Sequence, residues 1–192
     1  MARKFFTSDL HFGHENVIKY CNRPYSSARE MDEELIYNWN NTVQPSDIIY
    51  ILGDVFFCDA TQANTILNRL NGVKRLVYGN HDKTIRNQVP LQKHFDILPD
   101  LYQENIDGIL VFMCHYPMLS WNKAFHGSYM LHGHVHSQQP TDGQYRRYDV
   151  GVDANGYTPV RWEQIKKTLD GIPAGEPNKI RSDRKINQSK ST

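Results

Sequence analysis

The stretch DIIYILGD, residues 47–54, shows the pattern on which the fold of this chain depends. A short run of β-branched and aromatic residues that is closed by a glycine is typical of a buried strand. Four more runs have this character and each ends at a polar cluster: residues 4–8, 73–78, 109–114 and 128–132. Because all five runs lead directly into Asp, Asn or His, we expect their polar ends to lie close together in space.

Longer amphipathic segments separate these runs. Residues 31–40 carry apolar side chains at helical spacing, and residues 60–70 do the same after Asp59, a suitable N-cap. A further strand is expected at residues 148–152 and a short helix at residues 162–169. Alternation of strands and helices indicates an α/β fold, in which ligands bind where the carboxyl ends of the strands meet loops.

The charge balance argues against a protein that binds long polyanions. The 192 residues include 22 Lys and Arg against 21 Asp and Glu, a formal net charge of +1. The length fits one domain, predicted over residues 1–171, and residues 172–192 have the composition of a flexible tail. Three scattered cysteines and the lack of a signal or membrane-spanning segment favour a soluble, cytoplasmic protein without a membrane partner, and the oligomeric state stays open.

The most informative feature of the composition is its nine histidines. A lone histidine or a Gly-Asp pair is usually structural, but here five strand ends each supply a side chain that can bind a metal. The seven nitrogen and oxygen donors are Asp9, His11, Asp54, Asn80, His115, His134 and His136. A donor set without thiolates favours Mn, Fe, Zn or Ni at a catalytic site over structural zinc.

Seven ligands are too many for one catalytic ion and suit two ions that share a ligand. Asp54 is the natural bridge, because a carboxylate has two oxygens and Asp54 is central in the order of the motifs. Two divalent ions with a bridging hydroxide stabilise the attacking and leaving oxygens in phosphoryl hydrolysis. The ions would also supply positive charge that a nearly neutral chain lacks.

The order of the motifs resembles that of a known group of proteins. D-x-H, G-D, G-N-H-D, H and G-H-x-H follow one another at residues 9–11, 53–54, 79–82, 115 and 133–136, as in the calcineurin-like metallophosphoesterase superfamily. The run SDLHFGHENVIKYCNRPY is further similar to a small bacterial and phage subgroup of predicted phosphoesterases. The resemblance implies a four-layer αββα sandwich with two mixed β-sheets and a metal centre between their strand ends.

The resemblance also implies a role for each motif residue. The first ion would be bound by Asp9, His11, Asp54 and His136. The second ion would be bound by Asp54, Asn80, His115 and His134. His81 would act as the general acid, oriented by Asp82, and imidazole suits this role because its pKa lies near neutral pH.

The sequence gives less evidence for the residues that contact substrate than for the metal ligands. His14, Arg23 and the ligand Asn80 are candidates for contacts to the phosphate, and the alternative for the first two is a loop histidine and a solvated surface arginine. The aromatic residues of segment 116–125 either stack on a nucleobase or belong to the core. Asp149, Asp153 and Asn155 are not expected as ligands, although a position near the site is plausible for them, and His94, His126 and His132 are expected to be structural.

The sequence therefore predicts a dinuclear metal-dependent phosphoesterase. Two divalent ions are expected, Mn²⁺ first, with Fe, Zn or Ni as alternatives. Short spans between the motifs leave no room for a capping domain, so an open site and a nucleotide or nucleic-acid end as substrate are favoured, as a phosphomonoester or a phosphodiester. One alternative is a catalytically silent metal-binding scaffold of the same fold. Another, a β-lactamase-like hydrolase, would need an H-x-H-x-D-H cluster that the chain lacks.

Overall fold

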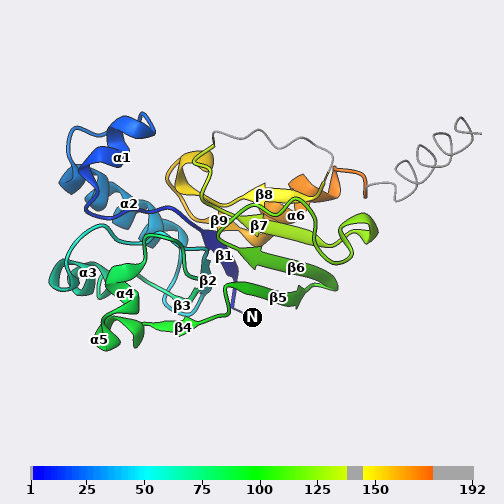
Figure 1. Ribbon diagram of the computed structural model, residues 1–192, viewed down its shortest axis with the longest axis horizontal. Helices are drawn as coiled ribbons and strands as arrows, with labels where there is room; N and C mark the ends of the chain where they lie inside the picture. The colour runs from blue at the N-terminus through cyan, green and yellow to red at the C-terminus, as the bar shows by residue number, and fades with distance from the viewer. Residues whose placement is uncertain (1, 138–144, 175–192) are drawn as a thin grey trace, which may run out of the picture.

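Two β-sheets packed face to face form the centre of the computed structural model, which describes residues 2–137 and 145–174 (Figure 1). The first sheet has the strand order β4-β3-β2-β1-β9, with bounds β1 Lys4–Thr7, β2 Ile48–Ile51, β3 Val73–Leu76, β4 Phe95–Ile97 and β9 Val160–Arg161. Strands β1 to β4 are parallel, and β9 is antiparallel to β1. This mixed sheet carries the first three motifs.

The second sheet carries the remaining two motifs. Its order is β5-β6-β7-β8, with bounds β5 Leu101–Ile106, β6 Ile109–Cys114, β7 Tyr129–His132 and β8 Arg147–Asp149. Strands β6, β7 and β8 are parallel, and β5 is antiparallel to β6. The expected α/β fold with two mixed sheets is therefore confirmed.

Apolar side chains on both faces of the first sheet explain why its strands are continuously hydrophobic. Successive side chains of a strand point to opposite faces. Phe5 and Ile49 belong to the core under the helices, whereas Phe6 and Tyr50 belong to the core between the two sheets. The Phe6 and Tyr50 rings stack with their centroids 5.0 Å apart.

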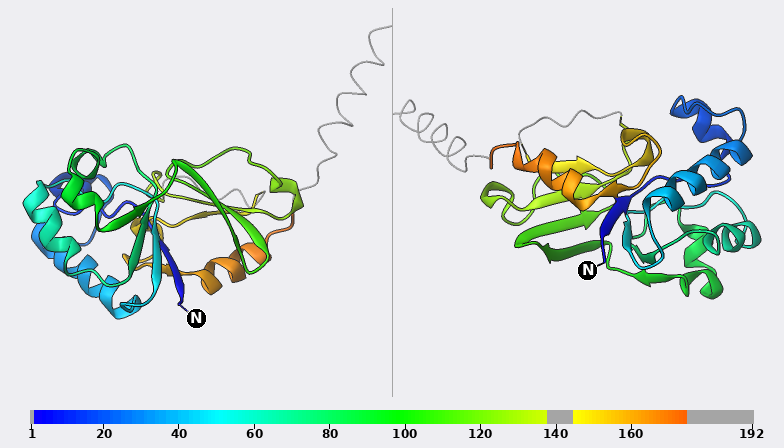
Figure 2. Two further views of the ribbon diagram at one scale, coloured as in Figure 1. Left: turned by 90° about the horizontal axis from the view of Figure 1, so that it is seen from below. Right: turned by 180° about the vertical axis from the view of Figure 1, so that it is seen from behind.

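Five helices cover the outer face of the first sheet (Figure 2). Their bounds are α1 Glu15–Tyr20, α2 Ala28–Thr42, α3 Ala60–Leu67, α4 Lys83–Arg86 and α5 Val89–Gln92. Side chains cap two of them: Ser27 accepts a hydrogen bond from the Glu30 amide at the start of α2, and Asp59 accepts one from Gln62 at the start of α3. The N-cap expected at Asp59 is thus confirmed.

The opposite side of the sandwich is covered more lightly. Helix α6, Trp162–Asp170, contacts β1, β8 and β9 and contributes Ile165 and Leu169 to the core between the sheets. Among the described residues, the outer face of the second sheet is covered by a loop that contains the 3₁₀ helix Ala124–His126, with Trp121 in the small core beneath it. The fourth layer of the expected sandwich is here a loop and one helical turn.

Two remaining expectations concern the ends of the chain and the membrane. Most of the expected tail, residues 175–192, lies outside the described residues. Within the described part of the chain, no helix combines the length and the apolar character that a membrane span needs.

Candidate metal centre

Five loops that follow strands β1, β2, β3, β6 and β7 meet between the two sheets and bring the seven predicted ligands together. Two contacts join the sheets at this point. The His134 backbone amide donates to Asp9 Oδ2 over 2.9 Å, and His115 Nε2 lies 3.0 Å from Asn80 Oδ1. The residues are up to 125 positions apart in sequence, so the fold and not local sequence assembles the site.

The ligand atoms form two groups, each compact enough to hold one ion. Within each group the atoms lie no more than 4.8 Å from one another: Asp9, His11 and His136 in the first, and Asp54, His115 and His134 in the second. Oδ2 of Asp54 lies 3.7 Å from His11 Nε2 and 3.5 Å from His115 Nε2. The carboxylate of Asp54 is therefore placed between the two groups, where a bridging ligand has to be.

Buried ligand atoms without hydrogen-bond partners show that the first group fits a cation. Asp9 Oδ1 and both ring nitrogens of His11 are buried and make no hydrogen bond. Unpaired buried polar atoms are rare in folded proteins because each one costs free energy. Burial raises the pKa of Asp9 to about 6 and lowers the pKa of His11 to about 2. A divalent ion would satisfy these atoms and favour ionised Asp9 beside neutral His11.

Hydrogen bonds from the far side of two histidines select the nitrogen that faces the site. His115 Nδ1 lies 2.7 Å from the Leu52 carbonyl oxygen, which can only accept a hydrogen bond. His136 Nδ1 lies 2.7 Å from Asp153 Oδ2. In both rings Nδ1 contacts an acceptor outside the ligand cluster, so Nε2 is the nitrogen directed toward the other ligands. Such outer hydrogen bonds are typical of metal-binding histidines.

The backbone of the ligand loops is strained. Asp9, His11, Asp54, His134 and His136 all have left-handed φ angles, between 46° and 73°. This conformation costs a residue other than glycine on the order of 1 kcal/mol or more, and it persists where the surrounding structure enforces it for function. Five of the seven predicted ligands share this strain, which supports a functional role for the cluster.

Two motif glycines permit the close approach of neighbouring loops. A Cβ atom on Gly79 would lie 2.1 Å from Asp54 Oδ1, and one on Gly133 would lie 2.0 Å from Ser8 Oγ. Neither distance is possible for real atoms. The G-N-H-D and G-H-x-H motifs therefore need glycine because the side chains of the first two motifs occupy the space beside them.

Asp82 does not have the expected contact with His81. Its carboxylate is buried and accepts hydrogen bonds from the backbone amides of Asp54, Val55 and Gly79 at 2.9, 2.9 and 2.7 Å. Asp82 therefore holds the Asp54 loop against the G-N-H-D loop. His81 is positioned differently, because its backbone amide donates to Asp54 Oδ1 over 2.8 Å.

Arg23 is also placed differently from the expected phosphate contact. Its guanidinium is buried, pairs with both carboxylate oxygens of Asp153 at 2.8 Å and donates to the backbone carbonyls of Asp9 and Leu10. These contacts direct its donors into the protein, so Arg23 supports the first motif from behind.

Asp153, which was not expected as a ligand, joins Arg23 to the ligand His136. Sequence reasoning missed this supporting role. Asp153 could also form a metal-binding triple with Cys21 and His136, but its carboxylate is already paired with Arg23.

Three aromatic rings lie at one rim of the centre. The His14 ring stacks on Phe57, with centroids 3.8 Å apart and planes 7° apart, and the His81 ring lies 4.9 Å from Phe57. Phe57 is 42% exposed. The predicted contact of His14 with substrate stays a prediction. Among the other histidines, buried His132 contacts the Gly133 carbonyl and His94 contacts Asn64, in line with structural roles.

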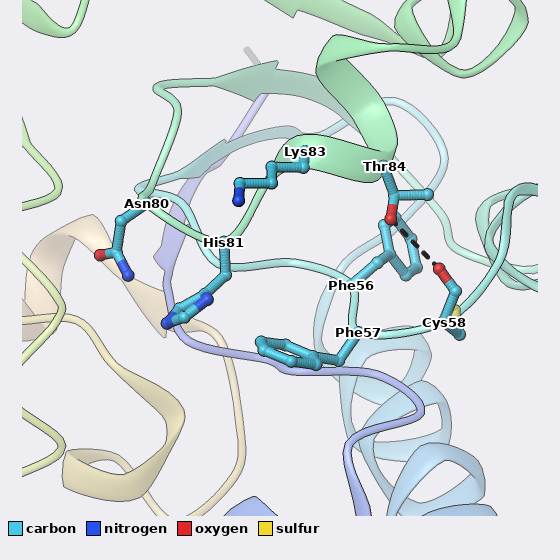
Figure 3. Close-up of a pocket in the computed structure, with 7 residues that line it drawn as sticks. All are labelled: Phe56, Phe57, Cys58, Asn80, His81, Lys83 and Thr84. Carbon is cyan, nitrogen blue, oxygen red and sulfur yellow. Dashed lines mark hydrogen bonds between the residues drawn. The ribbon is translucent and has the colours of Figure 1, made fainter.

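Two cavities share Asn80 as a lining residue. One of about 420 Å³ is lined by Phe56, Phe57, Cys58, Asn80, His81, Lys83 and Thr84 (Figure 3). The other, of about 260 Å³, is lined by Tyr78, Gly79, Asn80, Arg86, Asp100, Cys114, His115 and Tyr116. Of the aromatic segment 116–125, Tyr116 therefore faces the site, whereas Trp121 is buried and donates to Ser128.

The two mixed sheets and the clustering of the motif residues agree with what the sequence resemblance to the calcineurin-like metallophosphoesterase superfamily implies. No protein-family model matches the chain. The chain belongs to one family with the uncharacterized protein MJ1445 of Methanocaldococcus jannaschii, to which it is 33% identical over 177 residues, 88% of this chain and 93% of the relative.

Two further proteins are similar to the chain. The gene 66 protein of Mycobacterium phage D29 is 28% identical over 208 residues, 91% of this chain and 100% of the relative. Among solved structures, a protein of unknown function, AQ665 from Aquifex aeolicus, is 26% identical with a TM-score of 0.69, over 88% of this chain and 100% of that one.

Proposed function

We propose that this chain is a dinuclear metal-dependent phosphoesterase. One observation carries the proposal: Asp54 Oδ2 lies between two histidine groups, and the buried Asp9 and His11 donors beside it have no partner. Such an arrangement suits two divalent ions that share a carboxylate. We assign Asp9, His11, Asp54 and His136 to the first ion and Asp54, Asn80, His115 and His134 to the second.

The donor set determines the chemistry that the ions bring. Imidazole, carboxylate and amide donors without thiolate suit Mn²⁺, our first choice, as well as Fe, Zn and Ni. When bound, the ions supply a shared hydroxide as nucleophile and the positive charge that stabilises the phosphoryl oxygens. The hydrogen bonds of His115 and His136 to Leu52 and Asp153 fix the ligand nitrogens in advance.

We assign His81 as the general acid. Its ring lines the larger cavity, and among the described residues it makes no side-chain hydrogen bond that would occupy its nitrogens. The bond from its backbone amide to Asp54 fixes it beside the proposed bridging carboxylate. A proton donor at this place acts on the oxygen that leaves the phosphorus.

A phosphodiester is favoured over a phosphomonoester. A diester carries two groups on the phosphorus, and two cavities meet the centre at Asn80, which lines both of them. Each cavity offers an aromatic ring and a cation: Phe57 with Lys83, and Tyr116 with Arg86. These features suit a nucleotide or a nucleic-acid end.

Hydrolysis of bis-p-nitrophenyl phosphate and p-nitrophenyl phosphate with Mn²⁺, Fe²⁺, Zn²⁺ and Ni²⁺ tests the proposal. We expect turnover of the diester with Mn²⁺ and loss of turnover with EDTA. H81A should lower kcat by about 10²-fold or more while two ions still bind, whereas H94A, remote from the centre, should match the parent. Metal binding without turnover of any phosphoester would favour the scaffold alternative.

A further inference from the structure

The larger cavity beside His81 contains groups that the proposed reaction does not use. It measures about 420 Å³, and Phe57 and Lys83 line it together with His81 (Figure 3). We propose that this cavity binds the leaving group and that the leaving group is a nucleotide with a phosphate of its own. The substrate would then be a single-stranded oligonucleotide. This inference rests on the proposed function.

The position of His81, the proposed general acid, determines where the leaving group binds. Hydrolysis forms a new P–O bond from water and breaks the P–O bond to the leaving nucleoside. One hydrogen of the water stays on the new phosphoryl oxygen and the other is released to solvent as a proton. The leaving oxygen takes up a proton from His81, which is then reprotonated from solvent. The leaving oxygen must therefore lie within reach of His81, and the group attached to it must occupy the cavity that His81 lines.

Lys83 gives this cavity an unused positive charge. Across residues 2–137 and 145–174, its ammonium group makes neither a hydrogen bond nor an ion pair. Figure 3 shows the side chain extended over the cavity between Asn80 and His81. No Asp or Glu is among the residues that line the cavity. An uncompensated cation at this point favours a leaving group that is itself anionic.

Phe57 gives the same cavity an aromatic wall. The ring is 42% exposed, and an exposed aromatic ring beside a reaction centre is a suitable surface for stacking a nucleobase. Its position is fixed from two sides. His14 stacks on the ring, and the Phe57 amide donates to the Phe12 carbonyl over 2.8 Å. A fixed ring needs little ordering when a base binds.

A hydrogen bond ties the two parts of the cavity together. Thr84 Oγ1 donates to the carbonyl oxygen of Cys58 over 3.2 Å, drawn as the dashed line in Figure 3. This bond joins helix α4, which carries Lys83, to the loop that carries Phe57. The cation and the aromatic ring are thus held at a set separation, as recognition of a base and its phosphate requires.

Four substrates separate the contribution of the Lys83 charge from that of the Phe57 ring. They are a dinucleotide with a phosphate on the leaving nucleoside, the same dinucleotide without it, and the abasic form of each. We expect the extra phosphate to raise kcat/KM about three- to fivefold in the parent, because an ion pair with an exposed lysine contributes up to about 1 kcal/mol. K83Q should bring this ratio close to one, whereas K93Q, an exposed lysine at the C-terminal end of α5 that does not line the cavity, should preserve it.

The base is tested in the same way. F57L keeps an apolar side chain and removes the ring, so the preference for a base over the abasic form should fall about fivefold or more. Y37L, an exposed aromatic substitution on α2, should leave this preference unchanged.

Three results would overturn the inference. If the parent enzyme has the same kcat/KM with and without the extra phosphate, the cavity does not recognise a second charge. An equal loss on all four substrates in K83Q would place Lys83 on the scissile phosphate instead. An unchanged base preference in F57L would exclude stacking. Failure of the proposed function looks different, because bis-p-nitrophenyl phosphate would then not turn over at all.

Discussion

His136 Nδ1 lies 2.7 Å from Asp153 Oδ2, and the same carboxylate pairs with the buried guanidinium of Arg23. Burial lowers the pKa of His136, but the hydrogen bond to Asp153 and the charges of Asp9 and Asp153 outweigh it and raise the pKa overall. Asp153 thereby connects the G-H-x-H motif to the loop that follows α1. It orients a predicted ligand without itself being one of the seven.

D153N should weaken metal binding at the first group of ligands. The substitution preserves the size of the side chain but removes the charge that holds the Nδ1 proton of His136 and the guanidinium of Arg23. Loss of such an outer partner typically costs 10- to 100-fold in metal affinity, so we expect at least about tenfold for Mn²⁺, measured by isothermal titration calorimetry. D96N, which affects an exposed carboxylate, is the control. Equal affinities of D153N and the parent would refute the role of Asp153.

R23Q should destabilise the metal-free protein far more than R69Q. Both arginines form paired contacts with a carboxylate, but the Arg23 side chain is 0% exposed and Asp153 5%, against 43% for Arg69 and 57% for Glu33. Removing Arg23 takes a two-point partner from the buried Asp153 carboxylate and leaves it the contact to His136, at a cost of about 3 kcal/mol, whereas an exposed pair contributes less than about 1 kcal/mol. Urea denaturation in EDTA measures both. Similar losses for the two variants would contradict this difference.

Strands with two buried faces could be predicted from sequence, whereas of the edge strands β4, β5, β8 and β9 only β8 was expected, at residues 148–152 against the observed Arg147–Asp149. The apolar runs at β1, β2, β3, β6 and β7 are visible because neighbouring layers cover both faces. Strand β5 is half polar, since its outer residues face solvent, and strands β4 and β9 have three and two residues. The Asp107-Gly108 turn between β5 and β6, with φ of 50° and 80°, is a local hairpin signal that escaped our reading.

The cluster of ligands could be predicted because each ligand follows the end of a strand. The residues that hold the ligands in place could not, because they act through contacts between distant parts of the chain. Arg23 and Asp153 are 130 residues apart, and no pattern in either segment indicates that they pair. Asp82 is next to His81 in sequence, yet its carboxylate is directed to three backbone amides. Residue type and spacing predicted the donors, whereas the direction of each side chain required the fold.

G79A should disturb the centre without altering any ligand. The added methyl group would lie 2.1 Å from Asp54 Oδ1, so the Asp54 loop or the G-N-H-D loop has to move. Overpacking of this kind costs about 1 to 3 kcal/mol, and we expect that loss in urea denaturation together with weaker Mn²⁺ binding. G171A is the matched control, because its φ is −71° and the nearest atom lies at 3.4 Å. Parent-like stability and affinity in G79A would mean that the loops are not closely packed.

D32N should stabilise the protein in a pH-dependent way. Burial raises the pKa of Asp32 to about 6, although its carboxylate accepts hydrogen bonds from the Gly13 amide and Gln62. In the unfolded chain this pKa is about 3.9, so the unfolded state ionises more readily. Ionised Asp32 therefore destabilises the fold above pH 6, and this penalty disappears as the pH falls to about 4.

The difference between D32N and the parent isolates this one group from all others that titrate. Asparagine keeps the acceptor for Gly13 and carries no charge, so D32N should be more stable by about 1 to 2 kcal/mol at pH 8 and equal to the parent at pH 4. Urea denaturation at pH 4, 6 and 8 in EDTA provides the measurement, with D59N, an exposed N-cap, as the control. If D32N is instead less stable at pH 8, ionised Asp32 stabilises the Gly13 loop and the sign of the argument is reversed.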